Sequence, residues 1–259
     1  MVKTVSCLYK HQFEKLFSHN FKENSVRLIK INRPRVKNAF NEEVFTTITN
    51  ILNSDAGSDA IAFTILTGTG NVFSSVIELQ PNKIINVDAI KHFINALINH
   101  PKLIIAVVNG PAIGIAASIL PLCDIVFGSS RATFVTPFIK HGFIPEACSS
   151  HLFPRTMERS KAMEMLLLGE TFTARDALNA NLISKIIPHD ELDEHLENLL
   201  SLDSFSVDWT KTIKRLFNDS MKDKLEKFND NEMTLVKNKL NSGSYLQAVQ
   251  KYQLKKHKL

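Results

Sequence analysis

Two segments of the sequence, residues 107–124 and 133–150, have residue types and spacing that suit proton transfer beside a carbonyl group. In the first, an apolar stretch runs through an Asn-Gly-Pro turn at 109–111 into a series of small residues. This pattern predicts a strand, a tight turn and a helix whose N-terminal amides a ligand oxygen can approach closely. In the second, Glu146 lies in a short run of otherwise apolar residues. A carboxyl group in such surroundings is expected to have a raised pKa, which suits it to general acid–base chemistry.

An alternation of strands and helices must position these two segments. Apolar or β-rich runs predict strands at residues 25–31, 60–67, 103–108, 124–128 and 182–187. Periodicity predicts helices at residues 42–52, 88–99, 159–168, 173–181, 191–200, 209–218, 221–238 and 244–252, and one from the small-residue series to about residue 122. Asn41 and Thr173 are the expected N-caps of two of these helices. Because helices alternate with strands early and dominate late, the sequence predicts an α/β fold with a parallel sheet and a C-terminal helical portion.

Length and composition limit the class of protein. With 259 residues, 44% of them hydrophobic and 22% charged, the chain has the composition of a globular protein with one main domain and a helical tail. Its formal net charge of +5 is too weak and dispersed to indicate nucleic-acid binding. No apolar run in the sequence reaches the ~18–20 residues of a membrane span. The three cysteines have neither paired nor metal-ligand spacing, so no disulfide framework and no metal site are expected.

Several short motifs, spread over residues 25–259, together carry a resemblance to a known family. They are Asn32-Arg33-Pro34 with Lys37-Asn38-Ala39-Phe40, Phe73-Ser74-Ser75, Asn109-Gly110-Pro111-Ala112-Ile113-Gly114, Leu122-Cys123-Asp124-Ile125-Val126, Thr136-Pro137-Phe138, Pro145-Glu146-Ala147-Cys148-Ser149-Ser150 and Phe153-Pro154. In this order they resemble the crotonase, or enoyl-CoA hydratase/isomerase, superfamily, and they are most similar to its peroxisomal Δ3,Δ2-enoyl-CoA isomerase branch. The resemblance implies a peripheral segment over residues 1–24, a crotonase-type ββα spiral over 25–200 and a C-terminal helical trimerisation portion over 201–259.

The resemblance also implies an active site and a reaction. Glu146 would be the catalytic acid and base, and the main-chain N–H groups of Ile77 and Ile115 would form an oxyanion hole. The residues placed along the substrate are Lys37, Asn38, Ala39, Phe40, Ser74, Ser75, Val76, Glu78, Gly114 and Tyr252. The implied reaction belongs to the β-oxidation of unsaturated fatty acids: Glu146 moves a proton of a 3-enoyl-CoA from C2 to C4 while the thioester oxygen carries negative charge. The coenzyme A thioester is the substrate, and no cofactor is implied.

Residues at and near the implied site separate this reaction from others of the superfamily. Ser118 and Phe138 occupy the two positions at which hydratases carry carboxylates, which disfavours a hydratase. A dienoyl isomerase, which needs a carboxylate at the Phe138 position, is disfavoured for the same reason. His141 is either a second proton carrier or, as we favour, a histidine of the pocket wall. We expect Cys148 to serve packing and Asp124 to be a structural carboxylate near the start of a strand.

Three residues depart from the family pattern. Val76 and Glu78 replace the usual glycine and aspartate of the first oxyanion loop. Because valine tolerates a positive φ poorly, Val76 is expected to disturb the Ile77 donor. Ala147 replaces the glycine after the catalytic glutamate, and its methyl group is expected to crowd the thioester or narrow the acyl pocket. Two hypotheses remain: an active isomerase, which the retained Glu146 favours, and a degenerate crotonase that binds acyl-CoA or a protein partner without turnover, which Val76 favours.

Partners and location follow from the same resemblance. Acyl-CoA is the expected small-molecule partner, and a homotrimer or hexamer is the expected assembly. The tail His257-Lys258-Leu259 is similar to the peroxisomal Ser-Lys-Leu signal, so we expect an import receptor as a partner and the peroxisomal matrix as the location. A mitochondrial or cytoplasmic location is the alternative, because a lysine-rich chain end can finish this way by chance.

Overall fold

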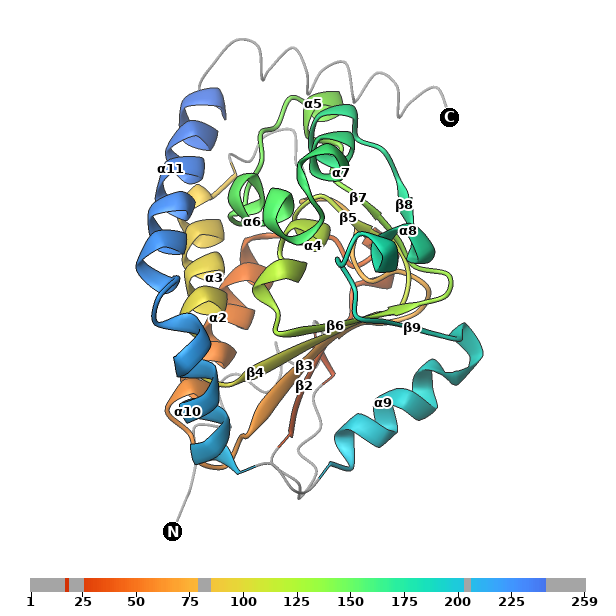
Figure 1. Cartoon of the computed structure of the whole chain (residues 1–259), viewed down its shortest axis with the longest axis vertical. Coiled ribbons are helices and arrows are strands. Elements are labelled where there is room, and N and C mark those ends of the chain that lie inside the picture. The colour runs from red at the N-terminus through yellow and green to blue at the C-terminus, as the bar shows by residue number, and fades with distance from the viewer. Residues whose placement is uncertain (1–16, 19–25, 79–84, 203–205, 241–259) are drawn as a thin grey trace.

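A mainly parallel sheet lies at the centre of the molecule (Figure 1). The structure is a computed structural model and describes residues 17–18, 26–78, 85–202 and 206–240. The strands of the sheet, in the spatial order β1-β2-β3-β4-β6-β9, are β1 (Phe17–Ser18), β2 (Val26–Ile31), β3 (Phe63–Gly68), β4 (Leu103–Val108), β6 (Ile125–Ser129) and β9 (Lys185–Ile187). β1 is antiparallel to β2, and the other neighbours run parallel. A smaller sheet, β5-β7-β8, comprises β5 (Ala112–Ile113), β7 (Thr133–Val135) and β8 (Phe172–Thr173).

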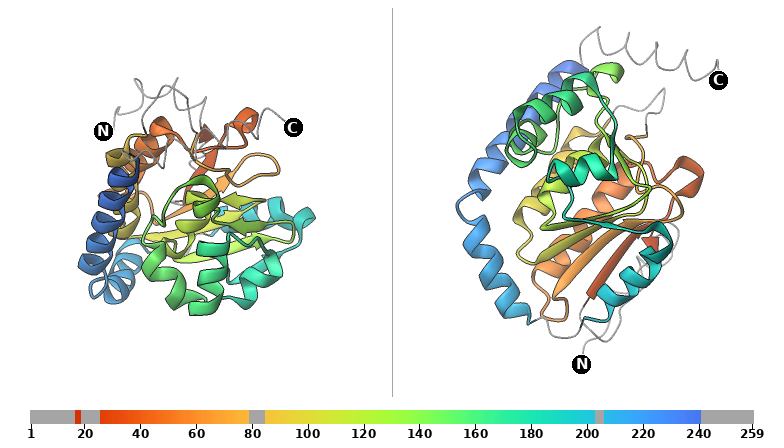
Figure 2. Two further views of the ribbon diagram at one scale, coloured as in Figure 1. Left: turned by 90° about the horizontal axis from the view of Figure 1, so that it is seen from above. Right: turned by 45° about the vertical axis from the view of Figure 1, so that its right-hand side comes forward.

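Helices surround these sheets. They are η1 (Pro34–Val36), α2 (Glu42–Ala56), α3 (Val87–Asn99), α4 (Ile115–Ser118), η2 (Leu120–Leu122), α5 (Phe138–His141), α6 (Ser149–Thr156), α7 (Arg159–Met163), the π-helix η3 (Glu164–Leu168), α8 (Ala174–Asn179), η4 (His189–Glu191), α9 (Leu192–Leu200), α10 (Val207–Asn218) and α11 (Lys222–Leu240). α2, α3 and α11 lie along one side of the molecule, and α9 lies on the opposite side (Figure 2).

Both faces of the larger sheet are buried, as the nearly continuous apolar sequence of its strands requires. Because successive side chains of a strand point to opposite faces, Ile29 and Ile31 of β2 join one hydrophobic core, whereas Val26 and Leu28 join the other. The first core contains the apolar faces of α2 and α3, and the second contains the leucines of α9. The sheet is therefore a rigid layer between helices, from which the connecting loops project.

The main elements confirm the sequence predictions. The five predicted strands correspond to β2, β3, β4, β6 and β9, with bounds that differ by up to three residues. The Asn41 side chain caps α2 by accepting from the Val44 N–H at 3.0 Å. Thr173 caps α8 in a reciprocal capping box with Asp176. The predicted helix at 244–252 lies outside the described residues, and the three domain bounds stay predictions.

Three details differ from prediction. The small-residue series is not one helix, because it contains the short strand β5, the one-turn helix α4 and the 3-10 turn η2 in succession. Gly114 has a φ of 64° between the first two, and Pro121 cannot donate the backbone hydrogen bond that would prolong α4. The segment 159–168 is a helical turn that widens into a π-helix. α6 was not predicted at all.

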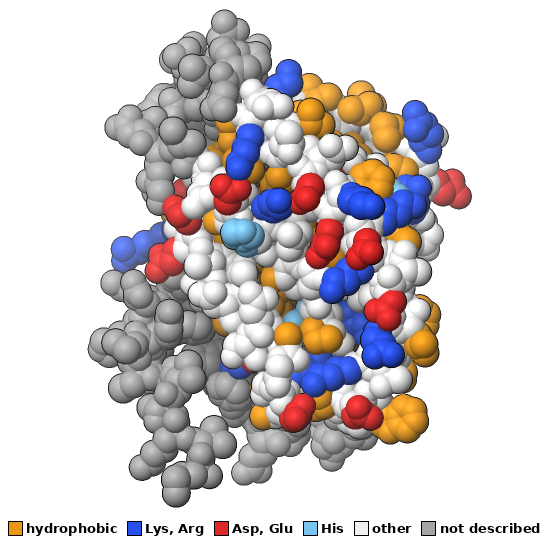
Figure 3. Space-filling model, turned by 90° about the vertical axis from the view of Figure 1, so that its left-hand side faces the viewer, with side chains coloured by type: hydrophobic (Ala, Val, Ile, Leu, Met, Phe, Trp, Pro, Cys, Tyr) orange, Lys and Arg blue, Asp and Glu red, His pale blue; other side chains and the backbone are white. Residues whose placement is uncertain are grey.

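Surface charge and helix length agree with the composition. On the face formed by α10 and α11, acidic and basic side chains are interspersed (Figure 3). Lys91 Nζ pairs with Asp230 Oδ1 at 2.9 Å, and Lys237 Nζ pairs with Asp88 Oδ1 at 2.7 Å. Such mixing gives a weak long-range field over that face. Within the described ranges, no helix is both long and apolar enough to cross a membrane.

Candidate active site

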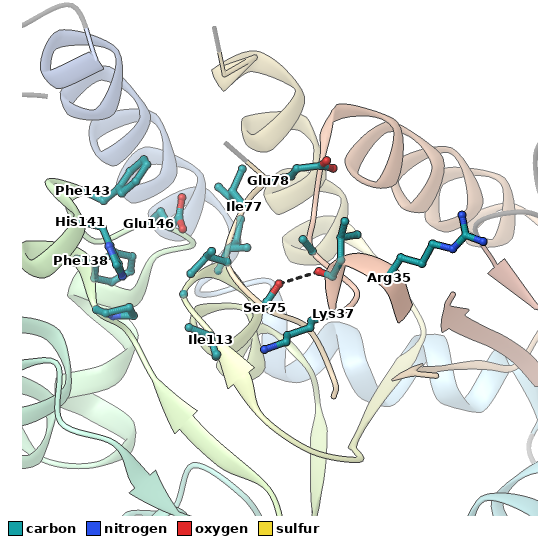
Figure 4. A pocket seen from close by; sticks show the side chains of 16 residues that line it. Arg35, Lys37, Ser75, Ile77, Glu78, Ile113, Phe138, His141, Phe143 and Glu146 are labelled. Atoms are coloured by element: carbon teal, nitrogen blue, oxygen red, sulfur yellow. Dashed lines mark hydrogen bonds between the residues drawn. The ribbon is translucent and has the colours of Figure 1, made fainter. Parts of the chain in front are cut away.

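A cavity of about 670 Å³ opens beside the two segments that the sequence singled out (Figure 4). Its walls include nine of the predicted site residues: Lys37, Ala39, Ser75, Val76, Ile77, Glu78, Gly114, Ile115 and Glu146. The other residues that line it are Arg35, Val36, Ile113, Pro137, Phe138, His141 and Phe143. The structure thus brings together residues that are up to 111 positions apart in the chain, and it sets an acid, two loop segments and two basic side chains around one space.

Glu146 lies in the loop between α5 and α6, in a wall that also contains Phe138, His141 and Phe143. Figure 4 shows it between Phe143 and Ile77. The residue is only 5% exposed, and burial raises the pKa of its carboxyl group to about 8, with the nearby carboxylate of Glu232 as the second cause. The raised pKa agrees with the sequence prediction. A group with this pKa gains and loses protons near neutral pH, as a general acid–base catalyst must.

Two residues that line the same cavity have backbone amides without an internal acceptor. Among the described residues, no hydrogen bond uses the N–H of Ile77 or of Ile115. The residue after Ile77 and the residue before Ile115 do have partners: Glu78 N–H donates to Phe40 O at 2.7 Å, and Gly114 N–H donates to Val135 O at 2.8 Å. Because backbone N–H groups in folded proteins almost always have a partner, two unpaired ones beside one cavity are suited to a ligand oxygen.

The loop that carries Ile77 has an ordinary backbone. Val76 is not among the residues with a positive φ, so the expected conflict between its branched side chain and a glycine-like conformation does not occur. The expectation that Val76 disturbs the donor for this reason is therefore wrong. Glu78 Oε2 accepts from Arg33 Nη2 at 2.7 Å, which ties the loop to the chain before η1. The glycine that this region needs is Gly114, whose φ is 64°.

The departure with a backbone consequence is Ala147. It has a φ of 58°, and the following Cys148 has a φ of 57°, so both residues occupy the left-handed region that disfavours side chains. Such a conformation costs about 1–2 kcal/mol per residue for an L-amino acid. The Glu146 carbonyl accepts from the Ser149 N–H at 3.1 Å, which closes this turn into the start of α6. The carboxyl group of Glu146 is therefore aimed by a strained turn.

Three predicted substrate-binding side chains lie elsewhere. Asn38, Phe40 and Ser74 are fully buried and do not line the cavity. Asn38 Nδ2 donates to Val72 O at 2.7 Å, and Ser74 Oγ donates to Asn38 O at 2.7 Å, while Phe40 stacks on Phe45. These side chains hold the loops behind the cavity in place. Tyr252 and the tail at 257–259 lie outside the described residues.

The remaining polar candidates take structural positions. Asp124 Oδ2 accepts from Ile104 N–H at 2.7 Å and from Lys214 Nζ at 2.8 Å, as expected of a structural carboxylate. Burial raises the pKa of the Cys148 thiol to about 12, which agrees with a packing role. His141 lines the cavity, and burial lowers the pKa of its imidazole, which favours the uncharged form. Within the described ranges, no group of three His, Cys, Asp or Glu residues could hold a metal ion.

Sequence reasoning missed Glu232. This residue of α11 is only 5% exposed, and its carboxylate contacts the turn after Glu146. Its sequence position offered one signal, because this charged residue directly precedes Met233 and lies within one turn of Asn229. The structure buries the face of α11 that carries these residues. Arg35, at the cavity rim, was missed as well.

The sequence profile of the family described as enoyl-CoA hydratase/isomerase matches residues 21–258. Enoyl-CoA delta isomerase 3, peroxisomal, of Mus musculus is 34% identical over 247 residues, which cover 91% of this chain and 78% of the relative. Enoyl-CoA delta isomerase 2 of Rattus norvegicus is 34% identical, over 92% of this chain but only 63% of its own length. The crystal structure of an enoyl-CoA hydratase/isomerase from Pseudoalteromonas atlantica T6c superposes with a TM-score of 0.86 at 29% identity, over 93% of this chain and 98% of that one.

Proposed function

The chain belongs to the enoyl-CoA hydratase/isomerase family, and on this premise we propose that it is a Δ3,Δ2-enoyl-CoA isomerase. It would convert a 3-enoyl-CoA into the trans-2-enoyl-CoA, a step in the β-oxidation of unsaturated fatty acids. The observation that carries this proposal is the combination at one cavity of a single buried acid, Glu146, with the two unpaired amides of Ile77 and Ile115.

One available acid suits a double-bond shift better than hydration. Of the two carboxylates that line the cavity, Glu78 is paired with Arg33, which leaves Glu146. Addition of water in this superfamily uses two carboxylates, and their positions are filled by Ser118, whose hydroxyl donates to Gly114 O at 3.2 Å, and by Phe138. A shift of the double bond needs one group that takes a proton at one carbon and returns it at another.

The proposed steps use this chain's own groups. The ionised carboxylate of Glu146 takes the proton from C2. The electron pair of that C–H bond forms a C1–C2 double bond, and the π pair of the C1 carbonyl moves to the thioester oxygen, which gives a dienolate that keeps the C3–C4 double bond. The N–H groups of Ile77 and Ile115 would donate to that oxygen, and removing one such donor from an enzyme typically costs ~2.7–4 kcal/mol. The C3–C4 π pair then takes the proton from the protonated Glu146 at C4, the C1–C2 pair moves to form the C2–C3 double bond, and the negative charge on oxygen restores the thioester carbonyl. Because the pKa of Glu146 is about 8, it can both accept and return the proton near neutral pH.

The basic side chains at the rim suit the coenzyme A part of the substrate. Arg35 and Lys37 both line the cavity, and they come from the segment around η1 (Figure 4). Their positive charges are complementary to the phosphate groups of coenzyme A. We place the thioester beside Ile77 and Ile115 and the nucleotide towards these two residues. Tyr252 stays a proposed contact with the nucleotide.

Location and assembly are part of the proposal. The similarity of the tail His257-Lys258-Leu259 to a peroxisomal signal and the name of the Mus musculus relative both support the peroxisomal matrix and an import receptor. The family resemblance supports a homotrimer or hexamer.

Two assays on the purified protein test the proposed reaction. Formation of the conjugated product from 3-hexenoyl-CoA is followed by absorbance, and hydration of trans-2-hexenoyl-CoA is followed by loss of the same absorbance. We expect isomerisation without appreciable hydration. Faster hydration than isomerisation would contradict the proposal. Tight binding of acyl-CoA with neither reaction would instead identify the degenerate crotonase that binds without turnover.

A further inference from the structure

We propose that Glu232 is a positioning residue of the active site: from α11, its carboxylate holds the turn that follows Glu146 and so fixes the carboxyl group of Glu146 in the cavity. This inference rests on the proposed function for its catalytic meaning. The geometric part of it does not depend on which reaction the cavity supports.

The Glu232 carboxylate accepts three hydrogen bonds from the start of α6. Oε2 accepts from the Cys148 N–H at 2.7 Å, and Oε1 accepts from the Ser150 N–H at 3.1 Å and from the Ser150 hydroxyl at 2.5 Å. The N-cap residue of α6, Cys148, makes no side-chain cap of its own. A carboxylate from a helix more than 80 positions later in the chain therefore satisfies N–H groups that a local Ser, Asp or Asn would otherwise cap.

The turn needs such external support because its backbone is strained. Ala147 and Cys148 have consecutive left-handed φ values of 58° and 57°, and neither residue is a glycine or an asparagine. Hydrogen bonds from backbone N–H groups to a charged carboxylate are among the stronger ones in proteins. Without these hydrogen bonds the strained turn would relax to a lower-energy backbone conformation. That change would move the adjacent Glu146 away from the cavity.

The position of α11 is fixed by its contacts with the rest of the fold. Asn229, one turn before Glu232, donates from Nδ2 to Asn95 Oδ1 at 2.7 Å and to Lys91 O at 3.1 Å on α3. Met233 and Val236 on the same face are buried in the main hydrophobic core. The position of the carboxylate is thus set by the packing of α11 on α3, not by the loop that it holds.

Glu232 is also the nearby charge that acts on Glu146. The elements packed around the turn carry other charged or titratable side chains, namely Lys91 of α3, His141 of α5, His151 and Arg155 of α6, and Lys224 of α11. Among these and Glu232, the group that contributes to the raised pKa of Glu146, after burial itself, is Glu232. The same residue therefore bears on both the place and the proton affinity of the catalytic acid.

Three substitutions separate charge from reach. Glu232→Gln keeps the length of the side chain and removes its charge, whereas Glu232→Asp keeps the charge and shortens the reach. Asp230→Asn is the matched control, because it removes a carboxylate from the same helix at a side chain that is 57% exposed and paired only with Lys91 among the described residues.

The measurements are a carbon-13 NMR titration of the Glu146 carboxyl group, assigned with Glu146→Gln, and amide hydrogen exchange at Cys148 and Ser150. We expect Glu232→Gln to lower the titration midpoint of Glu146 by about 1 pH unit, the scale of a near like charge, and Asp230→Asn to leave it unchanged. We expect exchange at Cys148 to speed up about tenfold or more in both Glu232 variants and not in the control.

An unchanged midpoint in Glu232→Gln would overturn the proposal, and so would unchanged exchange at Cys148 in Glu232→Asp. If Glu232→Gln does not fold, amide hydrogen exchange at Cys148 in Glu232→Asp still tests the proposal. Neither measurement requires turnover. A protein that shows both effects but fails the isomerase assay would therefore refute the proposed reaction and leave the positioning role supported.

Discussion

Replacing Glu146 by glutamine should change how the stability of the fold depends on pH. Burial raises the pKa of this carboxyl group from 4.5 to about 8, so the folded protein holds the proton more tightly than the unfolded chain does. The stabilisation from such a group is fully present below its unfolded pKa and is lost as the pH rises through its folded pKa. The stability of the parent is therefore expected to fall between pH 4.5 and pH 8.

The size of the effect follows from the two pKa values. Between pH 5 and pH 9, a group that titrates near 4.5 unfolded and about 8 folded changes the free energy of unfolding by about 4 kcal/mol. Glu146→Gln keeps the shape of the side chain and cannot ionise, so it lacks this loss. The difference in the free energy of unfolding between variant and parent should therefore move in favour of the variant by about 4 kcal/mol over this range.

Urea denaturation of both proteins at pH 5, 7 and 9 measures this difference. Asp230→Asn, at a mostly exposed carboxylate, serves as the control and should follow the parent at every pH. A difference between parent and Glu146→Gln that stays constant from pH 5 to pH 9 would mean that Glu146 titrates as an ordinary carboxyl group. The argument from burial would then be wrong.

Three further predictions concern the same cavity. Because only the ionised Glu146 can accept the C2 proton, kcat/KM should rise about tenfold per pH unit up to about pH 8 and then level off; a flat profile from pH 6 to pH 9 would contradict this. Val76→Gly should change kcat by no more than about twofold, since position 76 does not have a glycine-like φ. The added backbone freedom of glycine should lower the free energy of unfolding by ~0.5–1 kcal/mol. A large gain in steady-state activity would show that Val76 does distort the loop. Arg33→Ala should lower kcat about tenfold or more, because Glu78 loses the partner that ties down the Ile77 loop, and unchanged kinetics would rule out that role.

The elements with local signals were predictable from the sequence. β4 is an uninterrupted apolar run, and α2 has both an Asn cap and acidic residues in its first turn, so each carries its own evidence within a few residues. α6 has no such evidence, because it begins Ser-Ser, contains Pro154 and has few apolar residues. The first N–H groups of α6 are instead capped by the carboxylate of Glu232, which lies far away in the sequence.

The sequence placed Glu146, Ile77 and Ile115 at one site, and all three line the same cavity, but it did not predict the backbone conformation there. A residue type shows where a glycine has been replaced, but not which replaced position needs a positive φ. The sequence predicted a conflict with a positive φ at Val76, whereas the structure has the left-handed conformation at Ala147. The burial of Asn38 and Ser74 behind the cavity was equally invisible, because a motif gives the order of residues and not the direction of their side chains.

The central claim is that Glu146 carries the proton between C2 and C4, and the comparison of parent and Glu146→Gln with saturating 3-hexenoyl-CoA tests it most directly. Binding of an acyl-CoA should be measured on the same two samples by calorimetry. The predicted result is a loss of about 10²–10⁴-fold in kcat, the usual contribution of a general acid–base group, with the Kd for acyl-CoA changed by less than about threefold. Turnover by Glu146→Gln within about tenfold of an active parent would contradict the claim, because the proton would then travel without this carboxyl group.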